Sequence, residues 1–260
     1  MIKEEIKFQD STVFEGMTSI RAIIKARELN INDRRISKIL YDKEKLHKIQ
    51  KELGYLRAVS ENIGFKIEES TDSYLKKITL GTSYGGIVAI TEQRTIPRLT
   101  NESDILPCSL YCMIQGIEDP YNFGYSLRSL YAMGCSGIIL PERNWMSAAG
   151  VVARSSAGAS ELLPIYKSTP EEAIEVFKSK GYTTVCADER TDNLLGECEL
   201  KLPILMLVGG EKRGISKSIL EKADKLVRID YARDFHPSLS AASATTMFAY
   251  EVMRQNKIKL

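Results

Sequence analysis

A polar loop that follows an apolar run leads into a helical pattern containing Arg128. Pro120, Asn122 and Gly124 predict a turn in this loop, with a helix that begins by Tyr125. Arg128 then lies one helical turn beyond Gly124, so its guanidinium group can point back over the loop. A planar guanidinium group suits a phosphate or a carboxylate. The same residues also fit an ordinary helix start with a surface arginine.

A glycine-rich loop from Gly209 to Ile215 follows another apolar run. Glycines allow a backbone to approach a ligand closely. Gly209 and Gly214 have the spacing of the glycines in a nucleotide-triphosphate loop, but Ile215 stands where that loop has its phosphate-binding lysine. Because Glu211 adds an acid, the loop favours a ligand with hydroxyl groups or a cationic centre over a phosphate.

A third loop, residues 231–244, leads into a helix whose first turns are almost all small residues. Small side chains permit close approach of a ligand or of another helix. The same pattern is explained if Ser238 is a helix N-cap and the alanines only pack against their neighbours.

Other reaction classes fit the sequence less well. The chain has only His47 and His236 for a hydrolase triad, and it lacks a G-x-S-x-G elbow.

Short apolar strands alternate with amphipathic helices from Ser109 onward. Strands are expected near residues 110–114, 137–140, 183–187, 204–208 and 226–229. Helices are expected near residues 124–133, 146–155, 170–180, 216–222 and 238–255. This alternation predicts an α/β fold with a mostly parallel sheet covered on both faces. Ligands of such sheets bind beyond the carboxyl ends of the strands, which is where the three loops lie.

The front of the chain predicts a smaller α/β unit with helices near residues 19–27 and 42–53. A polar, aperiodic segment containing Pro97 follows it and is typical of a linker. We therefore expect a first domain at residues 1–95, a linker at 96–106 and the larger α/β domain at 107–260.

The composition is that of a globular protein, with 43% hydrophobic and 27% charged residues and a net charge of only +2. Residues 1–100 contain 18 Lys and Arg and 14 Asp and Glu, so the front part of the chain carries a small positive surplus of charge. No apolar run approaches a membrane span, and we expect a cytoplasmic protein. Cys108 and Cys112 match neither a zinc ribbon nor an iron–sulfur site, so we expect no metal.

The three loops together resemble the signature motifs of the SpoU (TrmH-like) branch of the SPOUT superfamily of RNA methyltransferases. The first motif is similar to Asn122-x-Gly124-x-x-x-Arg128 and the second to Gly209-x-Glu211-x-x-Gly214-Ile215. The third resembles Ile229 at the end of a strand with Ser238-Leu239 at the start of the last helix.

The chain departs from the third motif at two positions. Ser240 stands where the family usually has an asparagine, and Ala242 where it usually has a serine. The loop after Ile229 is also one residue longer. In the front part, the segment after Gly16 and the segment from Tyr84 resemble the family's substrate-binding domain.

The resemblance implies an α/β domain with a carboxyl-terminal trefoil knot, preceded by a small α/β RNA-binding domain. It implies transfer of a methyl group from S-adenosylmethionine to a ribose 2′-hydroxyl of structured RNA, tRNA or rRNA, by a homodimer without metal. Arg128, Asn122 and Glu211 would be the catalytic residues, with Arg128 either as general base or as stabiliser of the developing alkoxide. Cofactor contacts are expected from six further residues: Gly209, Gly210, Gly214, Ile229, Ser238 and Leu239.

Two alternatives remain open from the sequence. The departure at Ser240 is compatible with a non-catalytic RNA-binding protein that retains the fold. A different nucleotide-binding α/β enzyme is the second alternative.

Overall fold

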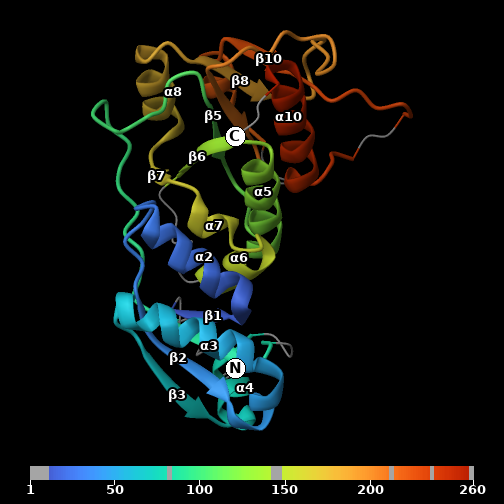
Figure 1. Cartoon of the computed structure of the whole chain (residues 1–260). Coiled ribbons are helices and arrows are strands. Elements are labelled where there is room, and N and C mark those ends of the chain that lie inside the picture. Colours follow the sequence, from blue (N-terminus) through green and yellow to red (C-terminus); the bar gives the residue numbers. More distant parts are fainter. Residues whose placement is uncertain (1–11, 81–83, 142–147, 211–213, 235–236, 258–260) are drawn as a thin grey trace. The chain divides into compact units, whose positions relative to one another are not determined.

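The computed structural model describes residues 12–80, 84–141, 148–210, 214–234 and 237–257. The chain divides into two compact units (Figure 1). The first comprises residues 1–95 together with 144–162, and the second comprises residues 96–143 and 163–260.

The first unit is built on a four-stranded mixed sheet with the order β1-β4-β2-β3. The central strands β4 and β2 pair antiparallel, as do β1 and β4, whereas β2 and β3 run parallel. The strands are β1 (Val13–Glu15), β2 (Ile36–Asp42), β3 (Lys66–Ser70) and β4 (Ile87–Thr91).

Helices cover both faces of this first sheet. Helices α2 (Gly16–Glu28) and α3 (Leu46–Ile63) pack on one face, where Ile87 and Ala89 of β4 meet their apolar residues. The alternate residue Val88 points to the other face and packs with Leu75 of α4 (Asp72–Ile78). This two-residue period is the one expected of a strand covered on both sides. A single turn of 3-10 helix, η1 (Lys43–Lys45), precedes α3.

Two short helices from the middle of the chain also belong to the first unit. They are α6 (Ala149–Ser155) and α7 (Ala159–Leu162), which the sequence analysis placed in the larger domain. The Arg34 Nε donates to the Glu161 carboxylate at 2.9 Å, with both side chains almost fully buried. Close packing adds to this, since a Cβ on Gly158 would lie 2.5 Å from the Cβ of Ala22. The chain therefore passes between the two units three times.

The second unit contains a six-stranded sheet with the order β10-β8-β9-β5-β6-β7, in which every pair is parallel. This confirms the expected fold class. The strands are β5 (Leu110–Ile114), β6 (Cys135–Leu140), β7 (Ile165–Lys167), β8 (Thr183–Ala187), β9 (Ile204–Val208) and β10 (Lys225–Val227). The edge strand β7 was not expected, because three residues carry too short a pattern to read.

Helices lie on both sides of the second sheet (Figure 1). Phe177 of α8 (Pro170–Ser179) packs on Tyr111 and Leu205 of the sheet, with α9 (Lys217–Leu220) nearby in the same core. Helices α5 (Pro120–Ala132) and α10 (Ala241–Asn256) pack against each other, and Thr246 donates to Ser129 at 2.7 Å. None of the helices in the described part of the chain has the length and apolarity needed to cross a membrane.

Candidate functional site

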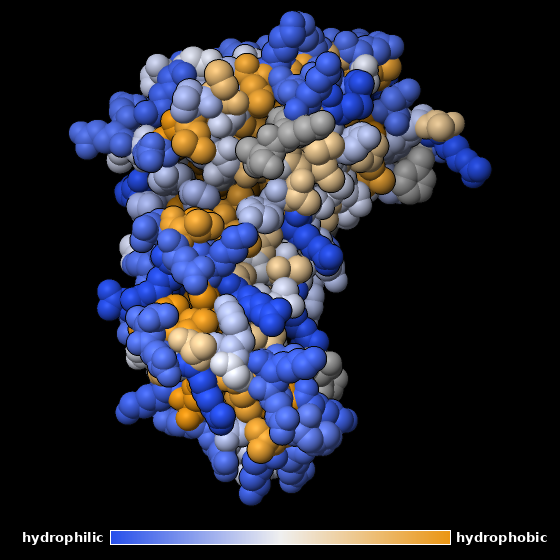
Figure 2. Space-filling view, viewed as in Figure 1, coloured by the Kyte–Doolittle hydropathy of each residue, from blue (hydrophilic) through white to orange (hydrophobic). Residues whose placement is uncertain are grey.

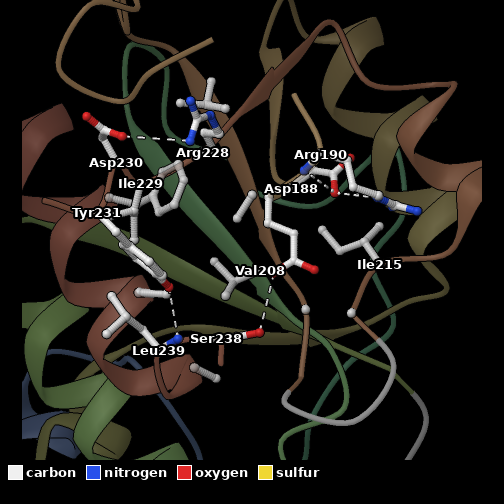
Figure 3. Close-up of a pocket in the computed structure, with 18 of the residues that line it drawn as sticks. Asp188, Arg190, Val208, Ile215, Arg228, Ile229, Asp230, Tyr231, Ser238 and Leu239 are labelled. Carbon is white, nitrogen blue, oxygen red and sulfur yellow. Dashed lines mark hydrogen bonds and ion pairs between the residues drawn. The ribbon is translucent and has the colours of Figure 1, made fainter. Parts of the chain in front are cut away.

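A cavity of about 880 Å³ opens at the carboxyl ends of the neighbouring strands β10, β8 and β9 (Figure 3). Its walls come from the residues that follow each of these strands and from the first turns of α10. Parallel sheets place ligand sites at this edge, because the loops that leave the strands converge there. The position matches the one expected from the sequence.

The glycine-rich loop forms one wall and makes close backbone contacts, both within itself and with the loop after β5. A Cβ on Gly209 would lie 2.6 Å from the carbonyl carbon of Gly214. A Cβ on Gly210 would lie 2.2 Å from the carbonyl oxygen of Gly116, two residues after the end of β5. Gly214 adopts a φ of +59° and donates its N–H to the Gly210 carbonyl at 3.1 Å. Close backbone packing thus requires glycine at positions 209 and 210, and the positive φ favours it at position 214, whereas the sequence suggested close approach to a ligand.

The loop after β10 forms the opposite wall. Ile229, Ser238 and Leu239 line the cavity, and the Leu239 N–H donates to the Tyr231 hydroxyl at 3.1 Å (Figure 3). Ile229 was expected to be the last residue of a strand, but it lies two residues beyond the end of β10, whose pairing with β8 ends at Val227.

The last helix begins later than the sequence indicated. Ser238 does not open it; Ser240 is the N-cap and its side chain accepts the N–H of Ser243 at 3.2 Å. Serine and asparagine are both good N-caps, so the departure at this position preserves the helix start. The small residues Ala241 and Ala244 face the cavity.

Charged side chains after β8 and β10 line the cavity and were missed by the sequence analysis. Asp188 accepts from Arg190 Nε at 2.9 Å, and Arg228 lies 3.7 Å from Asp230 (Figure 3). Glu189 accepts from the Ser238 hydroxyl at 3.5 Å. The rule that ligands meet the carboxyl ends of strands would have identified residues 188–190, since they directly follow an expected strand.

Thiol chemistry is not available next to the cavity. Burial raises the pKa of the Cys186 thiol, just before the end of β8, to about 12. It therefore stays protonated and serves as a small apolar residue. Within the described ranges, no group of His, Cys, Asp or Glu residues is arranged to hold a metal ion.

The segment from Pro120 to Gly124, which was expected to form a turn before a helix, is itself the first part of α5. Asp119 is the N-cap of α5, accepting from the N–H of Tyr121 at 2.6 Å, and Pro120 occupies the first turn. An aspartate followed by proline is a helix-start signal that the turn interpretation overlooked. Asn122 therefore lies in the first turn, and Arg128 lies in the middle of α5 with an exposed side chain.

The structure brings six of the nine candidate site residues together. Gly209, Gly210, Gly214, Ile229, Ser238 and Leu239 all line the cavity. Asn122 and Arg128 are not among the residues that line it. Glu211 lies outside the described residues.

The parallel sheet, the glycine-rich loop and the cavity at the strand ends form an α/β domain with a ligand-sized site at the carboxyl edge of its sheet. The SpoU rRNA methylase family profile matches residues 109–250, more than half of the chain. The chain belongs to the SpoU rRNA methylase family.

Curated relatives are similar over part of their length. A putative TrmH family tRNA/rRNA methyltransferase of Staphylococcus saprophyticus is 31% identical over 148 residues, 56% of this chain and 59% of the relative. An uncharacterized tRNA/rRNA methyltransferase of Mycobacterium leprae is 28% identical over 204 residues, 76% of this chain and 65% of the relative. The chain thus spans somewhat less than two thirds of the length of these relatives.

Solved structures resemble nearly the whole chain. An S-adenosylmethionine-bound rRNA methyltransferase from Sinorhizobium meliloti has a TM-score of 0.77 at 22% identity, covering 97% of this chain and 94% of that one. The SpoU methyltransferase AviRb from Streptomyces viridochromogenes, also with the cofactor, has a TM-score of 0.74 at 23% identity, covering 94% and 89%. These likenesses show the fold.

Proposed function

We propose that this chain transfers a methyl group from S-adenosylmethionine to a ribose 2′-hydroxyl of tRNA or rRNA. The observation that carries the proposal is the cavity at the ends of β8, β9 and β10, which is lined by six residues of the family's second and third motifs. Family membership supplies the reaction class, and the named relatives supply the class of RNA.

The cavity residues fit this cofactor. Its walls combine apolar side chains, such as Val208, Ile215 and Phe248, with the backbone of the glycine-rich loop. The Asp188 and Glu189 carboxylates add hydrogen-bond acceptors for hydroxyl or amino groups. Glu189 also adds negative charge for a cationic centre, whereas the charge of Asp188 is balanced by Arg190 at 2.9 Å. A sulfonium cofactor with an adenosyl group has the apolar surface, the hydroxyl and amino groups and the cationic centre that complement these walls.

The reaction is an in-line displacement in which the ribose oxygen attacks the methyl carbon while the bond from carbon to sulfur breaks. S-adenosylmethionine supplies the activated methyl group. The protein must align the two centres and assist loss of the hydroxyl proton. An arginine is a poor base because its pKa lies above about 12. We therefore assign Arg128 to gripping the adjacent phosphate and stabilising the developing alkoxide.

A second copy of the chain would bring Arg128 to the cavity. Arg128 lies on α5 in one exposed stripe with Tyr121 and Tyr125, and Tyr250 is exposed on the neighbouring α10. Figure 2 shows pale and light-orange residues over this part of the surface. Exposed aromatic side chains gathered on two packed helices are typical of a protein interface. The site is then a composite, with the cofactor cavity from one protomer and Arg128 from its partner.

The structure weakens the case for a protein that keeps the fold without the cofactor. That alternative rested on Ser240 in place of asparagine. Ser240 caps α10 as an asparagine would, and the cavity beside it is open. The trefoil knot implied by the resemblance stays a prediction, as do cytoplasmic location and the contribution of the first unit to RNA affinity.

Cofactor binding tests the proposal most simply. At about 100 times its dissociation constant, a ligand raises the free energy of unfolding by about 2.7 kcal/mol. We expect a clear rise in melting temperature with S-adenosylmethionine or its demethylated product. Ala244→Phe, which places a ring in the cavity, should abolish the rise, while Ala58→Phe on exposed α3 should not. If neither compound shifts the wild-type protein, the proposal is wrong.

A further inference from the structure

The outer surface of α2 and α3 carries a basic and aromatic stripe. Arg21 and Lys25 are one helical turn apart on α2, and Lys48, Lys51 and Tyr55 follow the same spacing on α3. All five side chains are exposed. Residues spaced three or four apart lie side by side on a helix, so each helix presents a continuous row. We call these five residues the α2–α3 face.

A contact between Arg21 and Tyr55 joins the two rows. The guanidinium carbon of Arg21 lies 5.3 Å from the centre of the Tyr55 ring, which is a cation–π distance. Tyr55 keeps 37% of its surface exposed. The helices beneath are fixed by the shared apolar core of Ile24 and Leu53. A cation and an aromatic ring are thus held together on a rigid surface, open to solvent.

The positive surplus of the front part of the chain is concentrated at these helices. Helices α2, η1 and α3 contain eight Lys and Arg against four Asp and Glu, whereas the other residues up to Thr100 contain ten of each. In the part of the chain that the structure describes, the four cations of the α2–α3 face have no ion-pair partner. By contrast, Lys45 forms ion pairs with Asp42 and Asp72 at 3.2 and 3.3 Å, and Lys76 forms one with Asp72 at 2.6 Å. Figure 2 shows hydrophilic residues interspersed with apolar ones over α2 and α3.

We propose that the α2–α3 face is the surface with which the first unit docks RNA, by phosphate contacts from its cations and by stacking of an unpaired base on Tyr55. Lys and Arg side chains that contact phosphates release the counterions condensed on the nucleic acid, which favours binding. Exposed aromatic rings backed by arginine are stacking platforms for bases in loops and bulges. The inference deepens the proposed function and rests on it for the choice of RNA as the partner.

The chain offers a matched control on the other side of the same sheet. Lys77 lies on α4, is exposed like Lys51, and also lacks an ion-pair partner among the described residues. Replacing Lys51 or Lys77 with alanine removes the same charge from the same unit. A general electrostatic effect would therefore lower the RNA affinity of both variants equally. If the α2–α3 face is the docking surface, only Lys51→Ala should lose affinity.

The experiment measures RNA binding by the full chain with fluorescence anisotropy across a range of salt concentrations. The probe is labelled bulk tRNA, and separately bulk rRNA, from cells that lack the protein. We expect Tyr55→Ala to weaken binding about tenfold, because one stacked base is lost, and Tyr55→Phe to bind as the wild type. Lys51→Ala should reduce the slope of log affinity against log salt by about 0.7 to 0.9. Lys77→Ala should leave both quantities unchanged.

Calorimetry with S-adenosylmethionine and thermal unfolding, run on the same variants, separate the possible failures. A wild-type protein that binds RNA but no cofactor would contradict the proposed function and leave the α2–α3 face standing. If Tyr55→Ala and Lys51→Ala are folded and bind both RNA pools as the wild type does, or if Lys77→Ala loses as much as Lys51→Ala, the α2–α3 face is not the docking surface.

Discussion

The Tyr231 hydroxyl accepts a hydrogen bond from the backbone N–H of Leu239 at 3.1 Å, closing the loop between β10 and α10. Both residues line the cavity. The bond fixes the loop in the shape that forms one wall of the proposed cofactor site.

Tyr231→Phe removes this hydrogen bond and keeps the ring. A net hydrogen bond is worth about 0.5–1.5 kcal/mol, and the cofactor would then have to order the loop on binding. We expect S-adenosylmethionine to bind roughly 2- to 10-fold more weakly by calorimetry. Tyr74→Phe, on the exposed surface of α4, is the control and should not change binding. Equal affinities for Tyr231→Phe and the wild type would show that the loop needs no such anchor.

The glycine-rich loop should be intolerant of any side chain at Gly210. A Cβ there would lie 2.2 Å from the Gly116 carbonyl oxygen, so Gly210→Ala forces two backbone segments apart. We expect a loss of about 1–3 kcal/mol in the free energy of unfolding, together with weakened cofactor binding.

Gly54→Ala is the matched control for this substitution. Gly54 lies in α3 with nothing within 4 Å of an added Cβ, so alanine should stabilise the protein by about 0.5–1 kcal/mol. Urea unfolding measures both variants. A Gly210→Ala protein of wild-type stability would mean that the close contact with Gly116 is not present in solution.

The ion pair between Arg34 and Glu161 should hold α7 on the first unit. Removing one partner of a buried pair leaves an uncompensated charge and costs about 3–5 kcal/mol. Glu161→Gln should therefore be strongly destabilising in urea unfolding. Glu68→Gln, which breaks an exposed pair with Lys38 at 3.1 Å, should cost at most about 1 kcal/mol. Similar small losses for both variants would contradict the assignment of α7 to the first unit.

Asp224 should contribute stability that depends on pH. Burial raises the pKa of its carboxyl group, but hydrogen bonds from Lys178 and Thr184 outweigh this and hold the pKa below its usual value. A lowered pKa stabilises the folded protein above the unfolded-state value of about 3.9 and stops doing so as pH falls through the folded value. The wild type should exceed Asp224→Asn in stability at pH 7, with a difference that shrinks below about pH 4. A constant difference across this range would contradict the linkage.

Much of the second unit could be predicted from the sequence because buried parallel strands read as short apolar runs. The expected runs at β5, β8 and β9 coincide with the observed strands. The position of the cavity followed from the general rule for such sheets. The start of α5 was misread because Pro120 was interpreted as a turn residue, although Asp119 before it is a helix cap.

Other features could not be read from the sequence for physical reasons. The assignment of α6 and α7 to the first unit depends on a contact between Arg34 and Glu161, which are 127 residues apart, and no local pattern carries such a contact. The Arg21–Tyr55 contact likewise depends on how two helices pack. The contacts that make Gly209 and Gly210 necessary come from Gly214 and Gly116, so composition indicated that glycine was needed but not why.

Methyl transfer by the purified full chain, with Arg128 varied, tests the proposed reaction and the role of Arg128 together. S-adenosylmethionine with a labelled methyl group is incubated with RNA from cells lacking the protein, and the nucleosides are analysed by mass spectrometry after digestion. We expect one or more 2′-O-methylated nucleosides with the wild type. With Arg128→Ala or Arg128→Lys, turnover should fall steeply while calorimetry shows nearly unchanged cofactor binding. A label found on a base, or an Arg128→Ala protein with wild-type turnover, would contradict this proposal.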